Sequence, residues 1–300
     1  MTDSTLRFTK GHGTENDFVL VPDPDGRLDL TPGQVAAVCD RRAGLGGDGL
    51  IRVVRCAAVT GEPAVSAQAG PAEWFMDYRN SDGSVAEMCG NGVRVFARYL
   101  VDAGLAPSGE LTVATRGGPK RVRLEAAGDV TVEMGQARLP EPSQVTVAVG
   151  QRCWPARNVD LGNPHAVAFV KDLADAGDLR AAPLVTPAGA YPAGVNVEFV
   201  VDRGPGHVAM RVHERGVGET RSCGTGTCAV LASVALRDGR ASVADGVAVA
   251  TEAAGAAYTV DVPGGRLRLW LGPEGQVEMA GPAVLLASGE IDLAALRPDR

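Results

Sequence analysis

The sequence predicts an α+β protein of two pseudo-symmetric domains, each a strand-rich barrel around a central helix, with the active site in the cleft between them. Glycine (39 residues) and proline (19 residues) are abundant, and aromatic residues make up 4% of the 300-residue chain. This composition favours many turns and short strands over long helices. In addition, Cys89-Gly-Asn-Gly recurs as Cys223-Gly-Thr-Gly, 134 residues later. Each copy follows a strand and a glycine-containing turn and leads into an apolar helix, so each half presents one cysteine at a helix start.

The N-terminal half alternates short apolar runs with turn residues. Thr31 followed by Pro32 is typical of a helix start, and the helix is expected to end at Gly44. Residues 56–72 are rich in Ala, Gly and Pro without periodicity, which predicts a surface loop. Strands are expected at residues 18–21, 50–54, 74–79, 111–115, 120–125 and 129–134.

Two principal helices follow the two cysteines. The first is expected to run from Cys89 to Gly104, and the second over residues 227–236. The first has an apolar face formed by Val93, Phe96, Ala97 and Leu100. Many short strands with only two principal helices argue against a doubly wound parallel sheet.

A domain boundary is expected near Met134, shortly before Pro140 and Pro142. The N-terminal domain would comprise residues 1–133 and the C-terminal domain residues 134–280. Strands of the second domain are expected at residues 144–149, 152–159, 166–170, 195–201, 207–213, 257–262, 266–271 and 276–280.

The overall charge and composition argue against several classes of protein. The formal net charge is −7 and no basic tract is present, which argues against nucleic-acid binding. No apolar run approaches membrane-spanning length, and the N-terminus lacks a signal-peptide pattern, so we expect a cytoplasmic protein. The six cysteines are too dispersed for a disulfide framework. Cys223 and Cys228 have neither a second pair nor a histidine at ligand spacing, so no metal site is expected.

Cys89 and Cys223 are suited to proton transfer at carbon. Because a helix start carries unsatisfied N–H groups and partial positive charge, a thiol placed there is expected to ionise more readily than a free one. One thiolate could remove a proton beside a carboxylate while the other thiol returns one to the opposite face. The helix starts would hold that carboxylate. The pair therefore predicts a racemase or epimerase without pyridoxal cofactor. The alternatives are a redox pair, which lacks the usual CxxC spacing, or two core cysteines, which Gly and Asn would pack poorly.

The chain resembles the diaminopimelate epimerase family from Phe8 to about Leu293. Six motifs in family order carry the resemblance, which makes it far more specific than any single motif. They are GHGTENDF (11–18), RRAGLGGDGL (41–50), YRNSDGSVAEMCGNGVRVFARY (78–99), LGNPHAV (161–167), GVNVEF (194–199) and RVHERGVGETRSCGTGTCA (211–229). Proline racemase-like and phenazine-biosynthesis isomerase-like proteins share the fold but not this full set. The resemblance also implies that residues 281–300 return to the N-terminal domain.

The resemblance implies roles for individual residues. Cys89 and Cys223 match the acid–base pair. Backbone amides that match the family's carboxylate site belong to Gly90, Asn91, Gly224 and Thr225. Residues that match substrate contacts are Asn16, Asn80, Asn163, Asn196, Glu214 and Arg215, while His165 and Glu214 match residues that adjust the cysteine acidities. Some relatives contact the substrate through Gln at the position where this chain has Gly49, so no substrate contact is expected there.

Each of these positions also has a structural interpretation. Asparagines at such positions commonly form turns or satisfy local backbone groups, a lone histidine is more often structural, and Glu214-Arg215 could be a solvated ion pair. Asp82-Gly83-Ser84 is interpreted as a turn, and Cys228 as helix packing. No role is assigned to Cys39, Cys56 or Cys153.

The resemblance implies interconversion of L,L- and meso-diaminopimelate for lysine and peptidoglycan-precursor synthesis, without a cofactor and in a homodimer. One alternative is a related racemase, also independent of pyridoxal phosphate, that acts on another amino acid. A second alternative, from another class, is a non-catalytic thiol module or metal-binding protein.

Overall fold

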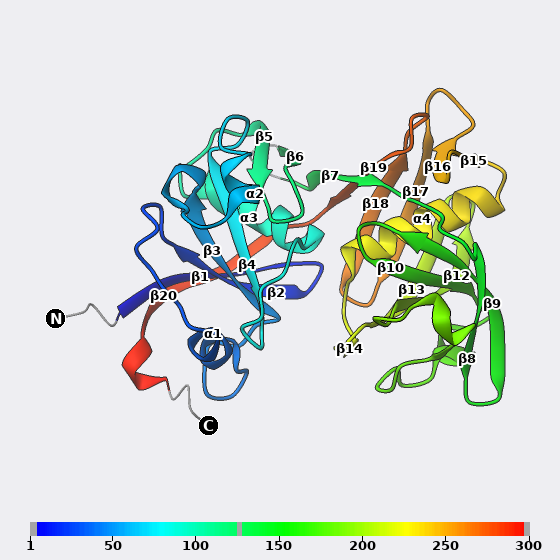
Figure 1. Cartoon of the computed structure of the whole chain (residues 1–300), viewed down its shortest axis with the longest axis horizontal. Helices are drawn as coiled ribbons and strands as arrows, with labels where there is room; N and C mark the ends of the chain where they lie inside the picture. The colour runs from blue at the N-terminus through cyan, green and yellow to red at the C-terminus, as the bar shows by residue number, and fades with distance from the viewer. Residues whose placement is uncertain (1–4, 125–127, 297–300) are drawn as a thin grey trace. The chain divides into compact units, whose positions relative to one another are not determined.

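The computed structural model describes residues 5–124 and 128–296, and it divides the chain into two compact units. The first unit comprises the described residues of Met1–Val132 and Pro282–Arg300, and the second is Glu133–Gly281. Both are rich in strands and contain few helices (Figure 1), which confirms the predicted α+β class. Among the described residues, no helix is both long enough and apolar enough to cross a membrane.

The first unit is a mixed sheet with helices packed on it. Its elements are β1 (Thr5–Gly13), β2 (Asn16–Pro22), α1 (Pro32–Cys39), β3 (Gly49–Arg55), η1 (Cys56–Ala58), α2 (Pro63–Ser66), β4 (Trp74–Asn80), α3 (Gly90–Asp102), β5 (Gly109–Ala114), β6 (Lys120–Leu124), β7 (Val130–Gln136), β20 (Val284–Asp292) and η4 (Leu293–Ala295). β7 continues across the boundary into the second unit. Position 125, where one expected strand would end, lies outside the described residues.

The second unit has the same style of construction. Its elements are β8 (Gln144–Val149), β9 (Arg152–Asp160), β10 (Pro164–Phe169), η2 (Leu173–Ala176), β11 (Leu184–Thr186), η3 (Ala188–Ala190), β12 (Asn196–Gly204), β13 (His207–Glu214), β14 (Gly218–Glu219), α4 (Gly224–Arg237), β15 (Ala241–Ala244), β16 (Val247–Ala250), β17 (Ala256–Val262), β18 (Gly265–Leu271) and β19 (Gln276–Gly281).

The two units repeat one order of strand pairing. In the first, β20, β1 and β2 pair antiparallel in turn, β2 pairs parallel with β3, and β3 pairs antiparallel with β4. β4 then pairs parallel with β5, which is followed by the antiparallel strands β6 and β7. In the second unit, β8, β9, β10, β12, β13, β17, β18 and β19 follow the same sequence of antiparallel and parallel pairings. The topology is therefore duplicated within the chain.

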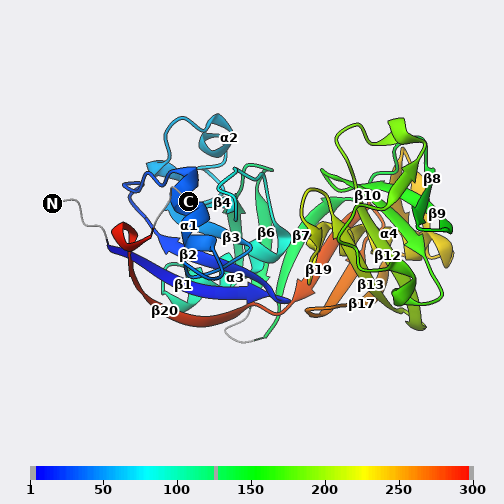
Figure 2. The ribbon, with the colours of Figure 1, turned by 90° about the horizontal axis from the view of Figure 1, so that it is seen from below.

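The closing strand of the first unit comes from the far end of the sequence. β20 lies beside β1 along its length, with Thr5 opposite Asp292 and His12 opposite Val284 (Figure 2). Sequence patterning did not predict β1, because polar residues interrupt its apolar positions. Its alternation of buried and exposed residues becomes evident once β2 and β20 flank it.

Each principal helix is the centre of its own unit. α3 contacts β1 to β6 and β20, while α4 contacts β9, β10, β12 and β15 to β19. Every residue of α3 from Gly90 to Leu100 is buried, so the expectation of a single apolar face understated its burial. Arg94 is fully buried, and its Nη2 donates a hydrogen bond to Thr14 Oγ1 at 3.1 Å.

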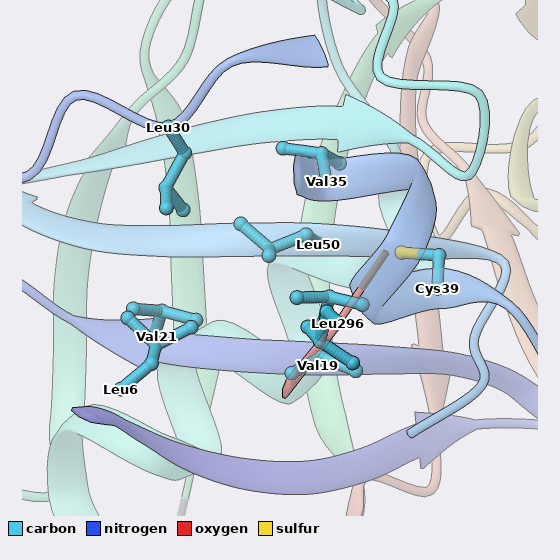
Figure 3. Packing of buried hydrophobic residues seen from close by; sticks show 9 residues of the cluster. Leu6, Val19, Val21, Leu30, Val35, Cys39, Leu50 and Leu296 are labelled. Carbon is cyan, nitrogen blue, oxygen red and sulfur yellow. The ribbon is translucent and has the colours of Figure 1, made fainter. Parts of the chain in front are cut away.

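One face of the β1–β2–β3 sheet is covered by α1. Figure 3 shows the packing of this cluster, which consists of Leu6, Val19, Val21, Leu30, Val35, Val38, Cys39, Leu50 and Leu296. The side chains of Thr31 and Gln34 cap the start of α1 reciprocally. The helix ends at Cys39 and not at the predicted Gly44, because the Asp40 carboxylate accepts the N–H groups of Arg42 and Ala43 and turns the chain.

The segment 56–72 is also more ordered than its composition predicted. It contains η1 and α2, and Cys56, Val65 and Ala72 pack in a buried cluster with Phe75. Gln68 Nε2 donates to Thr115 O at 2.9 Å, which ties the segment to the chain after β5. Most of the segment is exposed, as expected of a surface loop, but the two helical turns were not predicted because turns this short have no detectable periodicity.

The stability of the first unit is expected to fall at alkaline pH through Cys39. Burial raises the pKa of the Cys39 thiol to about 12. Below about pH 8.5, the pKa of a thiol in the unfolded chain, Cys39 keeps its proton in both states and its full contribution to the free energy of unfolding is present. Above that pH the unfolded chain ionises first, so the free energy of unfolding falls by about 1.4 kcal/mol per pH unit as the pH rises towards 12. Urea unfolding of Cys39→Ala between about pH 8 and about pH 10.5 should therefore show a weaker pH dependence than the wild type. The exposed Cys153→Ala is the control, and equal pH dependence in all three proteins would contradict the assignment.

Candidate active site

Cys89 and Cys223 occupy the same position in the two units. Each is the N-cap residue of its central helix, with extended backbone. Cys89 Sγ accepts a hydrogen bond from the N–H of Gly92 at 3.4 Å, and Cys223 Sγ accepts one from Gly226 at 3.4 Å. α4 thus begins at Gly224, three residues before the predicted start. The first turn was missed because Gly and Thr are weak helix formers.

The two helix starts are suited to binding anions. The first N–H groups of a helix have no partner within it, and the sulfur satisfies only one of them in each case. These groups and the positive end of the helix dipole favour a carboxylate. The amides of Gly90, Asn91, Gly224 and Thr225 all lie in these first turns.

On the first unit, Asn16 lies against Cys89. The Sγ of Cys89 donates to Asn16 Oδ1 at 3.6 Å, and Asn91 Nδ2 donates to the same oxygen at 3.1 Å. The other end of the Asn16 amide donates to Asp48 Oδ2 at 2.7 Å. The structure therefore brings three of the predicted residues together and adds Asp48, which sequence reasoning had not selected.

Asp48 is itself held by a charged group. Arg41 Nη2 lies 2.7 Å from both Asp48 Oδ1 and Asp17 Oδ1. Arg41 and Lys10 hold the pKa of the Asp17 carboxyl well below its usual range, although burial opposes them. The sequence feature that could have identified Arg41 and Asp48 as site residues is the RRAGLGGDGL motif, which contains both.

Asn80 lies in a turn at the end of β4. Its N–H donates to Ser84 O at 2.9 Å, and its Nδ2 donates to Ser84 Oγ at 3.0 Å. Gly83 has φ of +84°, a conformation that favours glycine, which agrees with the predicted Asp82-Gly83-Ser84 turn. Asn80 is paired with Gly49 across β3 and β4. A Cβ at Gly49 would lie 2.5 Å from the Tyr78 ring, so packing excludes a larger residue there.

On the second unit, polar side chains connect Cys223 to the strands. Thr225 Oγ1 lies 3.6 Å from Cys223 Sγ and accepts from Asn163 Nδ2 at 3.3 Å. Asn163 Oδ1 faces His165 Nε2 at 3.1 Å, and His165 Nδ1 lies 2.7 Å from Glu198 Oε1. Glu198 was not predicted as a site residue. The sequence feature that could have identified it is an acidic residue that stands alone within the apolar run at the start of β12.

Asn196, Glu214 and Arg215 form a second group on this unit. The N–H of Arg215 donates to Asn196 Oδ1 at 2.9 Å, and Asn196 Nδ2 donates to Pro164 O at 3.2 Å. Both ends of the Asn196 amide therefore serve the local backbone, which is the structural interpretation of this residue. The Thr220 hydroxyl donates to the Glu214 carboxylate. Arg215 Nη1 donates to Ala193 O at 3.4 Å.

Burial raises the pKa of the Cys223 thiol well above its ordinary value. The carboxylates of Glu214 and Glu198 raise it further, whereas hydrogen bonds from Thr225 and Gly226 lower it. The expectation that the helix start makes this thiol more acidic is therefore wrong for Cys223, because desolvation and two nearby carboxylates outweigh the helix terminus.

The other four cysteines lie away from this chemistry. Cys228 is fully buried on α4, which agrees with the packing role predicted for it. Cys39 and Cys56 are buried in the first unit and Cys153 is exposed, and the six cysteines, all within the described residues, form no disulfide.

The fold is shared with solved structures of an epimerase and of a phenazine biosynthesis protein. A hydroxyproline epimerase from Agrobacterium vitis has a TM-score of 0.65 at 15% identity, with 97% of this chain and 93% of that chain covered. A phenazine biosynthesis protein of the PhzF family from Bacillus anthracis has a TM-score of 0.63 at 15% identity, with 96% and 99% covered. At these identities the likeness shows the fold.

Sequence comparison identifies the particular family. The profile described as diaminopimelate epimerase matches residues 8–140 and 157–286. A diaminopimelate epimerase from Streptomyces coelicolor is 65% identical over 289 residues, 96% of each chain. One from Thermobifida fusca is 48% identical, with 97% of this chain and 100% of the relative covered. The chain belongs to the diaminopimelate epimerase family, and it is an isomerase.

Substitution of the third residue of each central helix is expected to have unequal effects. A Cβ on Gly226 would lie 2.7 Å from Glu198 Oε1, whereas a Cβ on Gly92 would meet its nearest neighbour, Ile51 Cδ1, at 3.3 Å. Gly226→Ala should lower the free energy of unfolding by about 1–3 kcal/mol, and Gly92→Ala by less than about 1 kcal/mol. Urea unfolding of both variants checks this, and an equal or reversed order would contradict the packing described.

Proposed function

We propose that this protein interconverts L,L- and meso-diaminopimelate by proton transfer between substrate and two thiols, Cys89 and Cys223. The observation that carries the proposal is the equivalent N-cap position of the two cysteines, at the starts of the only two long buried helices in the described residues. The named relatives, of which one is 65% identical, support the choice of substrate.

In the proposed reaction, one thiolate takes the α-proton, so that one C–H bond breaks and one S–H bond forms. The electron pair left behind is delocalised into the adjacent carboxylate. The other thiol then gives its proton to the opposite face of the carbon, and it becomes the thiolate. Atoms and charge balance, and the protein ends with the protonation states of its two thiols exchanged.

The helix starts are proposed to supply the stabilisation this reaction needs. The amides of Gly90, Asn91, Gly224 and Thr225 would donate to the reacting carboxylate, which gains negative charge as the proton leaves. Fixed N–H donors stabilise such charge strongly when water is excluded. We propose that the site forms in a cleft between two catalytic halves. The N-terminal half would comprise residues 1–133 and 281–300, and the C-terminal half residues 134–280.

Recognition of the remaining ends of the substrate is assigned to side chains that combine donors and acceptors. Asn16, Asn80, Asn163 and Asn196 can each donate and accept, Arg215 can take a carboxylate, and Glu214 can accept from an ammonium group. His165 and Glu214 would adjust the acidities of the cysteines. The position of Glu214 beside Cys223, where its charge raises the thiol pKa, supports this for Glu214.

Cys223 starts a catalytic cycle as the proton donor in this proposal. Its pKa lies well above the ordinary thiol value, so the unliganded protein presents a thiol at this position. Cys89 would then be the base for the stereoisomer bound to that form, after it loses the proton that it donates to Asn16 Oδ1. Turnover of the other stereoisomer starts from the form with the two protonation states exchanged.

We further expect a small-molecule enzyme of the cytoplasm that acts as a homodimer, without a cofactor, in lysine and peptidoglycan-precursor synthesis. Analytical ultracentrifugation of the purified chain tests the dimer. The alternative substrate, another amino acid, is tested by offering proline and hydroxyproline beside diaminopimelate in the assay below.

Exchange of the α-proton decides the proposal. The reduced protein is incubated with L,L-diaminopimelate in deuterated water, and NMR follows the α-proton signal and the appearance of the meso form. The wild type should exchange and epimerise, while Cys89→Ser and Cys223→Ser should epimerise at least about 100-fold more slowly, because each loses one acid–base group.

Cys153→Ser is the matched control, because Cys153 is exposed and has no role in the proposal. It should retain wild-type rates. Full epimerisation by either active-site variant, or no exchange by the wild type, would refute the two-thiol mechanism. Faster turnover of another amino acid would replace the proposed substrate and leave the mechanism in place.

A further inference from the structure

Glu198 is an acidic residue buried in the core of the second unit. It lies on β12 between Val197 and Phe199, and its side chain is 0% exposed. Oε1 lies 2.7 Å from His165 Nδ1, whereas Oε2 accepts no hydrogen bond from any described residue. A buried carboxylate with one oxygen unsatisfied costs several kcal/mol or more relative to an apolar residue of similar size. This cost points to a role other than stability.

The carboxylate of Glu198 lies close to the start of α4. A Cβ added to Gly226 would lie 2.7 Å from Glu198 Oε1 and 3.2 Å from Cys223 Sγ, so both atoms border the space that this glycine leaves open. No side chain from Gly226 separates them. In a site that excludes water, two negative charges this close oppose one another strongly.

His165 holds this carboxylate in place. It is fully buried on β10, which pairs parallel with β12, and its ring bridges Glu198 and Asn163. The chain of contacts continues through Asn163 and the Thr225 hydroxyl back to Cys223 Sγ. The Thr225 hydroxyl, which can donate, therefore lies 3.6 Å from the Cys223 sulfur, and the Glu198 carboxylate lies across the space left open at Gly226.

We propose that Glu198, held by His165, is a positioning residue that keeps the proton on Cys223 in the resting protein, so that the second unit supplies the proton donor. This inference rests on the proposed function of Cys223 as a proton donor. It adds the residue that keeps Cys223 protonated before the substrate binds. The charged and titratable groups that face Cys223 are Glu198 from β12, Glu214 from β13 and, through the contacts above, His165 from β10. Thr225 and Gly226 act in the opposite sense by donating to the sulfur.

The test compares the acidity of the Cys223 thiol in Glu198→Gln and the wild type. Iodoacetamide alkylates the intact, reduced protein across a range of pH, and mass spectrometry of the Cys223 peptide gives the midpoint pH. Gln keeps the shape and one hydrogen bond to His165 but removes the charge. The midpoint should fall by about half a pH unit or more, and alkylation near neutral pH should become at least about threefold faster.

Two further variants separate charge from loosened packing. Thr225→Val removes a donor to the thiolate and should move the midpoint upwards, whereas general exposure of the sulfur would move both variants downwards. Asp261→Asn is the matched control, because His207 Nε2 and Asp261 Oδ2 form a similar pair at 2.8 Å on the surface of the same unit. It should leave the Cys223 midpoint unchanged.

A midpoint in Glu198→Gln that is unchanged or raised would overturn the proposal, as would an equal shift in Asp261→Asn. If Glu198→Gln does not fold, Glu198→Met gives the same test, because it also removes the charge at similar volume. Alkylation needs no turnover, so the result remains readable even if the proposed reaction fails. In the active enzyme, the alkaline limb of kcat/KM should move to lower pH by the same amount as the midpoint.

Discussion

The N–H groups at the start of a buried helix have no partners within the helix, and much of this molecule is arranged around that constraint. α3 and α4 lie at the centres of their units, and the donors at their starts need partners from outside the helix. A cysteine sulfur accepts one N–H at 3.4 Å in each helix, which is a weak hydrogen bond. Donors at a helix start favour an anion, which is why the proposed function places the substrate carboxylate there.

The duplicated strand order explains why this constraint arises twice. In each unit a parallel connection separates the two halves of the sheet, and the central helix is part of that connection, after β4 in one case and after β13 and β14 in the other. The same chain path therefore delivers a cysteine to the same point of each sheet. Small residues at the helix starts are required by this path: at Gly226 even a methyl group would meet the Glu198 carboxylate.

The surroundings of the two cysteines nevertheless differ. Cys89 faces the amide of Asn16, whose orientation is fixed by Asp48 and Arg41. Cys223 faces two carboxylates and a hydroxyl, and its sulfur is more deeply buried. A duplicated fold thus places two cysteines at equivalent helix starts but in different surroundings.

The sequence by itself determined the α+β class, the two Cys-Gly-x-Gly helix starts and the family, because these depend on local composition and on motifs. It could not determine that α3 is buried on every side, that Cys56, Val65 and Ala72 pack in a buried cluster, or that Glu198 lies near the start of α4. Those features depend on contacts between residues far apart in the chain, such as His165 with Glu198 and Asp48 with Asn16. The acidity expected for Cys223 was reversed for the same reason: the helix start is local, whereas burial and the neighbouring carboxylates come from tertiary structure.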